Sequence, residues 1–533
     1  MRRFSFIFCL LLLLGLSSCE DFLKQTSQNL VTPTTVSEYK DLLQGEGYFQ
    51  EFSTHARFIN FMTDDMEYIN YPGSSPSTSS YINMYQNVYC WSQEIENDNF
   101  KDEWYGYLYS QVLAGNICLE YLDEVLGSDA EKKVLRGQAS FQRAYAYFLL
   151  ANTYGEPYDA TKLGEKCIPL TLTATPVTER YERATLGEIW AQIKSDIAVA
   201  VECLRDYSAA SNFEINYDAA LLLAQRVALY MNDYQLATTY GDMLLERKCD
   251  LWNISELGPM LTCSKQSNDG PSVTGQTEGF INRSTNCEIL WNFGTDDAVY
   301  KSIYNVLGMS ETELFRVTNY YPADLSHDGS LMSCYENEAN LLADTAVDNR
   351  KYYYLMPCRN KYVEDKHWTP ISITVKMYLK TLYNWSCTPC VIKYESLTNT
   401  LDQAFRTAEV YLNQAEAYAR RDNPDTSKAL ELLNTLRRHR IKGYTDLVSS
   451  DFTSTDELVA FIFDERRREL CFDEVHRWFD LRRQGCPELT HYWQGGVRFV
   501  LHEGDEGYTL AIPAEERSFD ASIPNPRPSR TAE

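Results

Sequence analysis

The chain has 533 residues, of which 44% are hydrophobic and 13% are aromatic. This composition excludes an intrinsically disordered chain and supplies enough apolar side chains for a large buried core. The formal charge of −26 argues against nucleic acid as a partner, because an acidic surface repels a phosphate backbone.

The N-terminus has the pattern of a secretory signal. Two arginines precede an apolar run from residue 4 to 14, which is too short to cross the roughly 30 Å hydrocarbon core of a bilayer. Residues 16–19 (LSSC) then resemble the lipobox of bacterial lipoproteins. We therefore predict that residues 1–18 are a signal peptide and that Cys19 carries a lipid anchor. The alternative is an ordinary signal peptide in which Cys19 is incidental.

Amphipathic helices are the main signal along the rest of the chain. In residues 185–204 apolar side chains recur every three or four residues, and Thr185 with Glu188 fits a capping box at the start. The same helical period predicts two helical hairpins. They comprise residues 218–230 with 234–245, and residues 406–421 with 426–440. Their alternating large and small apolar residues are typical of tetratricopeptide-like pairs, although no strict 34-residue repeat is present.

Two regions lack the helical period and are rich in Gly, Asn, Ser, Pro and aromatic residues. They are residues 50–100 and residues 247–400. Long irregular segments in a compact protein are more often functional surfaces than plain connections. We therefore expect ligand contacts in these regions. By contrast, Trp291 lies in an alternating segment, which predicts a buried strand.

The cysteines point to neither a metal site nor a redox centre. After Cys9 leaves with the signal and Cys19 takes a lipid, an odd number remains, so at least one thiol is free or intermolecular. Cys387 and Cys390 have redox or metal spacing, but no second such pair or histidine pair completes a zinc set. We predict no metal and no cofactor.

Several segments together resemble the SusD/RagB family. The N-terminal ones are residues 19–23 (CEDFL), 143–150 (RAYAYFLL) and 154–157 (YGEP), and the C-terminal ones are residues 406–412 (RTAEVYL), 465–473 (ERRRELCFD) and 477–482 (RWFDLR). Residues 472–476 (FDEVH) depart from the family, which usually has Phe-Glu-Gly before the arginine. The departure lies in the helical part of the expected fold and does not indicate which ligand is bound.

The resemblance implies a single, mostly α body of tetratricopeptide-like pairs with long irregular loops and minor β structure. We expect an N-terminal region at residues 19–246, a ligand-face region at 247–400 and a C-terminal helical region at 401–533. The implied function is that of a non-enzymatic lipoprotein on the outer face of the outer membrane. It would bind glycans and deliver them to a SusC-like TonB-dependent transporter. The alternative within the family is RagB-like peptide uptake.

Sugar rings stack on aromatic side chains while their hydroxyls bind polar neighbours. A receptor should therefore group exposed aromatic residues in the irregular regions. The candidates are Trp91, which comes first because related proteins often place a ligand-stacking Trp there, and Asn70, Tyr71, Gln93, Tyr304, Tyr320 and Tyr321. The alternative for each aromatic residue is burial, which pins the loop to the core.

Two other classes of function compete with a receptor. An enzyme needs paired carboxylates, and Glu465 and Glu469 lie four residues apart on one helical face. The arginines around them predict ion pairs that keep both carboxylates charged. Asp64-Asp65 and Asp296-Asp297 are further acidic pairs, interpreted as solvated loop charges or, less readily, as part of a calcium site. The other competitor is a pure scaffold that holds a partner protein.

Overall fold

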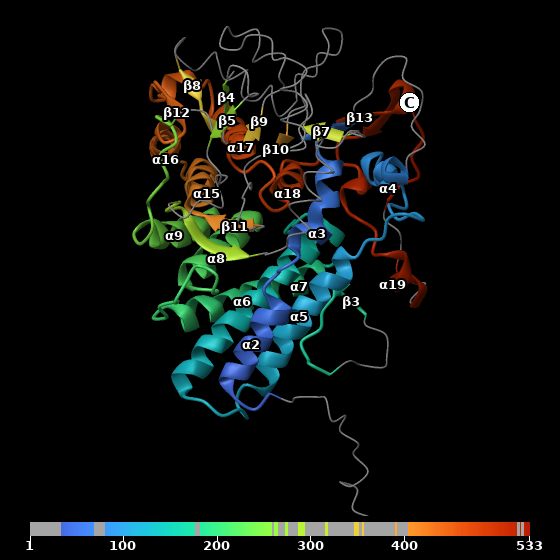
Figure 1. Cartoon of the computed structure of the whole chain (residues 1–533), viewed down its shortest axis with the longest axis vertical. Coiled ribbons are helices and arrows are strands. Elements are labelled where there is room, and N and C mark those ends of the chain that lie inside the picture. Colours follow the sequence, from blue (N-terminus) through green and yellow to red (C-terminus); the bar gives the residue numbers. More distant parts are fainter. Residues whose placement is uncertain are drawn as a thin grey trace, which may run out of the picture.

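Helices form most of the described chain, as the apolar period predicts (Figure 1). The computed structural model describes residues 33–68, 80–175, 182–257, 261–264, 272–275, 286–293, 315–317, 346–350, 354–356, 390–391, 403–519, 523 and 527–532. The helices are α2 (Val36–Gly47), α3 (Phe52–Ala56), α4 (Ser80–Tyr89), α5 (Trp104–Tyr121), α6 (Asp129–Tyr154), α7 (Leu186–Leu204), α8 (Tyr217–Tyr230), α9 (Tyr234–Leu245), α15 (Thr407–Arg420), α16 (Thr426–Arg438), α17 (Thr455–Glu469), α18 (His476–Arg483) and α19 (Ala514–Phe519).

The start of α7 confirms the predicted capping box. The Thr185 hydroxyl accepts a hydrogen bond from the backbone N–H of Glu188, and the Glu188 carboxylate accepts one from the backbone N–H of Thr185 at 2.8 Å. Two of the four unpaired N–H groups at the helix start are satisfied in this way. The apolar stripe of α7 faces inward and includes the fully buried Trp190.

Both predicted hairpins are confirmed. α8 and α9 form one pair, α15 and α16 form the other, and α15 also packs against α9 and α17. The two pairs therefore lie side by side, as Figure 1 shows. Asn232 makes the turn between α8 and α9 with a positive φ of 58°, a conformation that Asn tolerates better than most residues.

The strands of the described segments pair in twos and are all antiparallel. The pairs are β1 (Met66–Tyr68) with β7 (Phe315–Val317), β2 (Lys166–Pro169) with β3 (Arg183–Thr185), β4 (Leu261–Ser264) with β5 (Ser272–Gly275), β6 (Ile289–Phe293) with β11 (Gln403–Arg406), β8 (Val347–Asp348) with β12 (Ile441–Lys442), β9 (Leu355–Met356) with β10 (Cys390–Val391), and β13 (Leu489–Trp493) with β14 (Val497–Leu501). Trp291 of β6 is fully buried, which confirms its prediction as a core strand residue.

Residues 50–100 are more regular than predicted. The segment contains α3, the 3-10 helix η2 (Arg57–Met62), β1 and α4. The expectation of an irregular segment is therefore wrong for these parts. The physical reason is that Phe52, Phe58 and Phe61 are each almost fully buried, so the aromatic residues stabilise short helices by packing.

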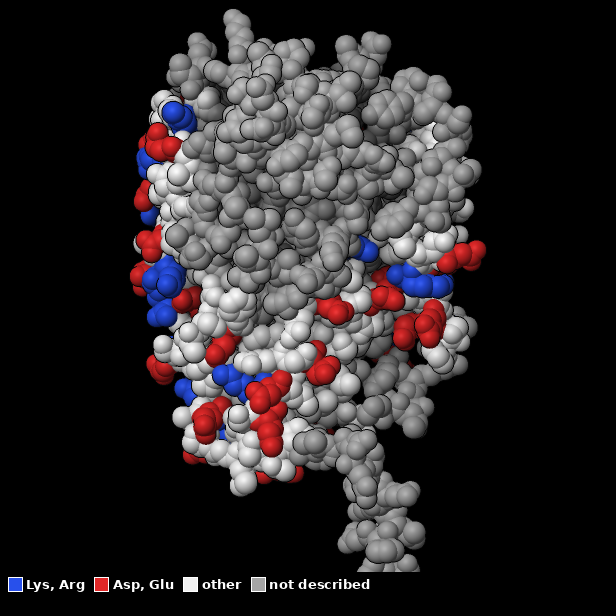
Figure 2. Space-filling view, viewed as in Figure 1, with Lys and Arg blue, Asp and Glu red and all other residues white. Residues whose placement is uncertain are grey.

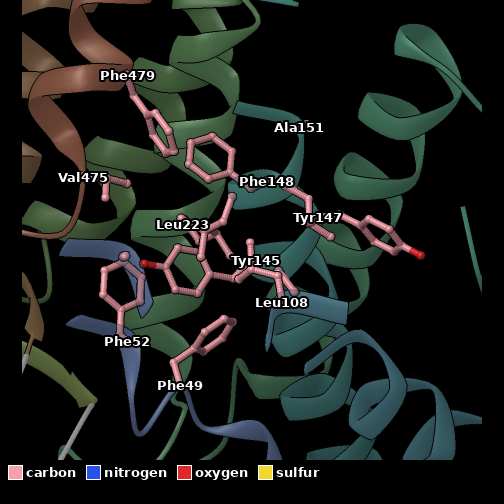
Figure 3. Close-up of a cluster of buried hydrophobic side chains, with 14 of the residues drawn as sticks. Phe49, Phe52, Leu108, Tyr145, Tyr147, Phe148, Ala151, Leu223, Val475 and Phe479 are labelled. Atoms are coloured by element: carbon pink, nitrogen blue, oxygen red, sulfur yellow. The ribbon is translucent and has the colours of Figure 1, made fainter. Parts of the chain in front are cut away.

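α6 runs through the middle of the core, and every residue from Gly137 to Tyr154 is buried. Figure 3 shows the rings of Tyr145 and Phe148 pointing toward side chains from both ends of the chain, among them Phe49 and Phe479. Tyr145 packs on Phe49 with ring centroids 4.8 Å apart, and Phe148 packs on Phe479 at 6.2 Å. One core thus includes side chains from the N-terminal and C-terminal regions, which confirms the predicted single body.

The described surface is consistent with the acidic composition. In the view of Figure 2, Asp and Glu side chains gather around the lower helical part of the molecule. Among the helices of the described segments, none combines the length and the apolar character needed to span a bilayer.

The close approach of α9 to α8 and α15 generates a stability prediction. A Cβ at Gly241 would overlap with the side-chain amides of Gln225 and Gln414, whereas a Cβ at Gly106 of α5 would meet no atom within 4 Å. We expect Gly241→Ala to lower the free energy of unfolding by about 1–3 kcal/mol. Gly106→Ala should raise it by about 0.5–1 kcal/mol, because alanine loses less backbone entropy. Urea unfolding measures both, and an unchanged midpoint for Gly241→Ala would contradict the packing.

Candidate functional site

Five rings from β1, β13 and residues 89–91 form a continuous series of contacts, two stacked and two tilted, and we call this series the aromatic ladder. From the outside inward its members are Tyr68, Trp493, Tyr89, His491 and Trp91. Successive ring centroids lie 4.6, 5.7, 4.1 and 4.0 Å apart. Tyr68 is half-buried and the other four are buried. Tyr68, at the outer end, is therefore the least buried ring of the ladder.

The prediction that Trp91 presents its ring to a ligand is wrong, because Trp91 is fully buried. Its indole nitrogen donates a hydrogen bond to the backbone carbonyl of Met62 at 3.0 Å, and its face lies against His491. Trp91 has a positive φ of 49°, an unfavourable conformation for a large residue, just after the end of α4. The ring pins this segment to the core, which is the alternative that the sequence left open.

The remaining predicted contacts stay predictions. Gln93 is exposed and lies two residues beyond the inner end of the aromatic ladder. Outside the described residues lie Cys19, Asn70, Tyr71, Asp296, Asp297, Tyr304, Tyr320, Tyr321 and Cys387.

Sequence reasoning missed four members of the aromatic ladder, namely Tyr68, Tyr89, His491 and Trp493. A signal for two of them exists in the C-terminal region. Every second side chain is buried in Leu489-Thr490-His491-Tyr492-Trp493. This alternation is typical of a half-buried strand. Nothing in that alternation shows which distant segment the strand covers.

Asp64 and Asp65 lie beside the aromatic ladder, and their interpretation as solvated loop charges is wrong. Arg477 donates two hydrogen bonds to the Asp64 carboxylate, both at 2.7 Å, and Arg467 Nε donates one to Asp65 at 2.7 Å. Burial raises the pKa of Asp64, but Arg467 and Arg477 outweigh it and lower the pKa to about 2. Burial, together with the charge of Asp64, raises the pKa of Asp65. Guanidinium groups thus already neutralise this pair.

Glu465 and Glu469 are also ion-paired, as predicted. Both are fully buried. Arg350 and Arg437 donate to the Glu465 carboxylate at 2.7 and 2.6 Å. Burial alone raises the pKa of Glu465, but the charges of Arg350, Arg437 and Arg468 hold it well below its usual range. A general acid requires the opposite shift, so this pair is structural.

The Glu469 carboxylate accepts hydrogen bonds from Arg406 Nη1 at 2.9 Å and from Arg440 Nε at 3.0 Å. The Tyr354 hydroxyl donates a further one at 2.9 Å. Burial raises the pKa of Glu469, but Arg440, Arg406 and Arg350 lower it overall. Glu469 therefore joins α17 to β11, to the end of α16 and to the segment around residue 350.

Glu409, Glu474 and His476 form a buried group with donor atoms within 4.8 Å of one another, the spacing of a metal site. Arg226 donates to Glu409 at 2.6 and 2.7 Å and to Glu474 at 2.8 Å. The guanidinium lies between the two carboxylates and takes the place that a metal cation would need. This group connects α8, α15 and the start of α18.

Replacing Glu469 tests the ion-paired core. Glu469→Gln removes the charge that balances Arg406 and Arg440, so we expect the free energy of unfolding to fall by about 3–5 kcal/mol. Asp464→Asn, on the exposed side of the same helix, should change it by less than about 0.5 kcal/mol. Chemical denaturation measures both variants, and equal effects would contradict the assignment.

Acid should destabilise the protein through the same groups. The pKa values of Glu465, Glu469 and Asp480 are lower in the folded chain than in the unfolded chain, so the unfolded chain binds more protons as the pH falls. Their contribution is fully present above the unfolded glutamate pKa of about 4.3 and is lost as the pH falls below it. We expect unfolding midpoints to drop steeply below about pH 4.3. A flat profile down to pH 3 would contradict this.

Comparisons with known proteins give a consistent family. Residues 21–229 match the profile of a SusD-like family described as "Starch-binding associating with outer membrane", and residues 337–517 match the profile of the SusD family. No curated protein sequence matches the chain.

Solved structures share the fold at low sequence identity. A SusD-like carbohydrate-binding protein from Bacteroides vulgatus is 18% identical, with 94% of this chain and 99% of that chain covered and a TM-score of 0.60. A SusD superfamily protein from Bacteroides fragilis is 19% identical, with 92% and 99% covered and a TM-score of 0.63. A laminarin-binding SusD-like protein is 16% identical, with 85% and 90% covered and a TM-score of 0.51. Because the body is helical and SusD profiles match both the N-terminal and the C-terminal parts of the sequence, the chain belongs to the SusD/RagB family.

Proposed function

We propose that this protein is a lipid-anchored outer-membrane protein that binds glycans at the cell surface and delivers them to a SusC-like TonB-dependent transporter. Family membership is the observation that carries the proposal, because the family matched at residues 21–229 is described by starch binding and association with the outer membrane. Two solved relatives are named for carbohydrate binding and for laminarin binding, which favours a glycan over a peptide.

Attachment to the membrane is proposed through Cys19. The N-terminal sequence ends its apolar run in a lipobox-like segment, and Glu20 and Asp21 directly after it resemble the surface-export signal of Bacteroidota lipoproteins. Lipid on Cys19 would place the body on the outer face of the outer membrane, beside a transporter in the same membrane.

The outer end of the aromatic ladder is the proposed platform for the glycan. Tyr68 is half-buried, and its ring is supported from behind by Trp493 at 4.6 Å. A ring held in this way loses little conformational freedom when a sugar stacks on it. The predicted residues Asn70, Tyr71, Tyr304, Tyr320 and Tyr321 are proposed to complete the site, and Gln93, which follows the inner end of the ladder, is proposed as a separate contact.

The carboxylates argue for binding rather than hydrolysis. Glycoside hydrolysis requires one carboxyl group that stays protonated beside one that is ionised. Glu465 and Glu469 both have lowered pKa values. Asp65 has a raised pKa beside the ionised Asp64, but its side chain is buried and bonded to Arg467, so it does not face a substrate. We therefore propose that the bound glycan is passed on uncleaved.

Calorimetry of the chain from residue 20 onward, titrated with starch, laminarin, other polysaccharides and peptides, tests the proposal. We expect one glycan class to bind without release of shorter products. Tyr68→Ala should weaken binding about tenfold, which is about 1.4 kcal/mol and lies within the range for an aromatic contact. Tyr121→Ala is the matched control, because this tyrosine is exposed on α5.

Cleavage of any glycan would contradict the receptor and favour an enzyme. Binding of peptides alone would favour RagB-like uptake. Equal affinities for the Tyr68→Ala and Tyr121→Ala variants would place the glycan elsewhere on the protein.

A further inference from the structure

His491, on β13, is buried with 4% of its surface exposed, and both of its ring nitrogens face backbone carbonyls. Nδ1 lies 2.8 Å from the carbonyl oxygen of Tyr89, and Nε2 lies 3.1 Å from that of Thr63. A carbonyl oxygen only accepts hydrogen bonds, so each nitrogen must carry a proton to make its bond. Neutral imidazole has one N–H, whereas the imidazolium cation has two.

The rings around His491 also favour a cation. Tyr89 lies 4.1 Å away and is tilted by 12°, and Trp91 lies 4.0 Å away and is tilted by 21°. Two rings that each lie nearly parallel to the imidazole at this distance cannot both cover the same face of it. The imidazole therefore lies between Tyr89 and Trp91. The electron-rich faces of tyrosine and tryptophan attract a cation. Burial opposes the charge, and the two charge-assisted hydrogen bonds and two aromatic faces offset that cost.

Within the described residues, charged and titratable groups lie on the elements next to this position. Burial raises the pKa values of Tyr89 and Cys90, so both stay neutral near pH 7. Asp64 and Asp65 are bonded to Arg477 and Arg467 respectively. The others are Glu67 and Tyr68 on β1, and Arg527 and Arg530 in the C-terminal segment, which reach Met62 Sδ and the Trp91 carbonyl. Tyr492 and Arg498 pair with each other on the opposite face of the hairpin.

We propose that His491 is held as an imidazolium cation and is a positioning residue for the aromatic ladder. Its two bonds join the end of η2 and the end of α4 to β13, the strand that carries Trp493 beneath Tyr68. The part of this inference that links glycan affinity to the proton rests on the proposed function. Loss of the proton breaks one of the two bonds, which loosens the support of Tyr68.

The sign of the pH dependence follows from where the proton is bound. The folded chain holds the proton, whereas an exposed histidine in the unfolded chain releases it near pH 6.5. The stabilisation is therefore fully present below about pH 6.5 and is lost as the pH rises through the titration of the folded protein.

Nuclear magnetic resonance of the wild-type protein labelled with 15N-histidine tests the protonation without any variant or ligand. The His491 ring is assigned through its contacts with the ring protons of Tyr89 and Trp91. We expect both nitrogens to be protonated at pH 7.5, where an exposed histidine is mostly neutral. A neutral ring with a single N–H at pH 7.5 would overturn the proposal.

His491→Gln then tests the positioning role, with the exposed His502→Gln as the matched control. In the wild type and the control, we expect the melting temperature and the glycan affinity to fall between pH 7 and 9. In His491→Gln, we expect neither quantity to show this pH dependence. An unchanged profile in His491→Gln would overturn the positioning role. If both nitrogens are protonated and no glycan binds at any pH, the imidazolium assignment stands and the proposed function fails.

Discussion

Glu469 is fully buried among three arginines that come from distant parts of the chain, Arg350, Arg406 and Arg440. A guanidinium group is charged near neutral pH, so a carboxylate partner strongly stabilises an arginine in the core. Glu469 and its neighbour Glu465 on α17 provide that partner for several arginines at once. The position of α17 therefore sets the positions of β8, β11 and the end of α16, and through them the two helical hairpins.

The aromatic ladder depends on this arrangement. Arg467, on the same helix as Glu469, bonds to Asp65 immediately before β1, and Arg477 of α18 bonds to Asp64. These bonds hold the segment that carries Tyr68 against the C-terminal helices. The β13–β14 hairpin then supplies His491 and Trp493 to fill the space between Tyr68 and Trp91. Ion pairs place the segments, and aromatic stacking fixes their side chains.

The same residue types would support hydrolysis or recognition, and their surroundings decide between the two. Burial alone pushes a carboxyl group toward its protonated form, which suits a general acid. Here each buried glutamate of α17 has arginine partners that reverse the shift. The buried glutamates of α17 therefore hold the body together.

The sequence by itself determined the features that depend on neighbours a few residues away. Helix α7 with its capping box and the two hairpins follow from spacings of three or four residues, which fix one face of a helix. The sequence predicted that Glu465 and Glu469 are ion-paired, but the tertiary structure decided most of their partners, because Arg350, Arg406 and Arg440 come from distant segments. The motifs that resemble the SusD/RagB family, at both ends of the chain, also predicted a single helical body. Tertiary structure alone decided the fate of Trp91 and of Asp64 and Asp65. Trp91 is covered by His491, and His491 bonds to Tyr89, which lies 402 residues away in the chain. Asp64 is bonded to Arg477, 413 residues away. Exposure is a property of the packed molecule, so no local pattern distinguishes a ring that stacks on a ligand from one that stacks on a distant histidine.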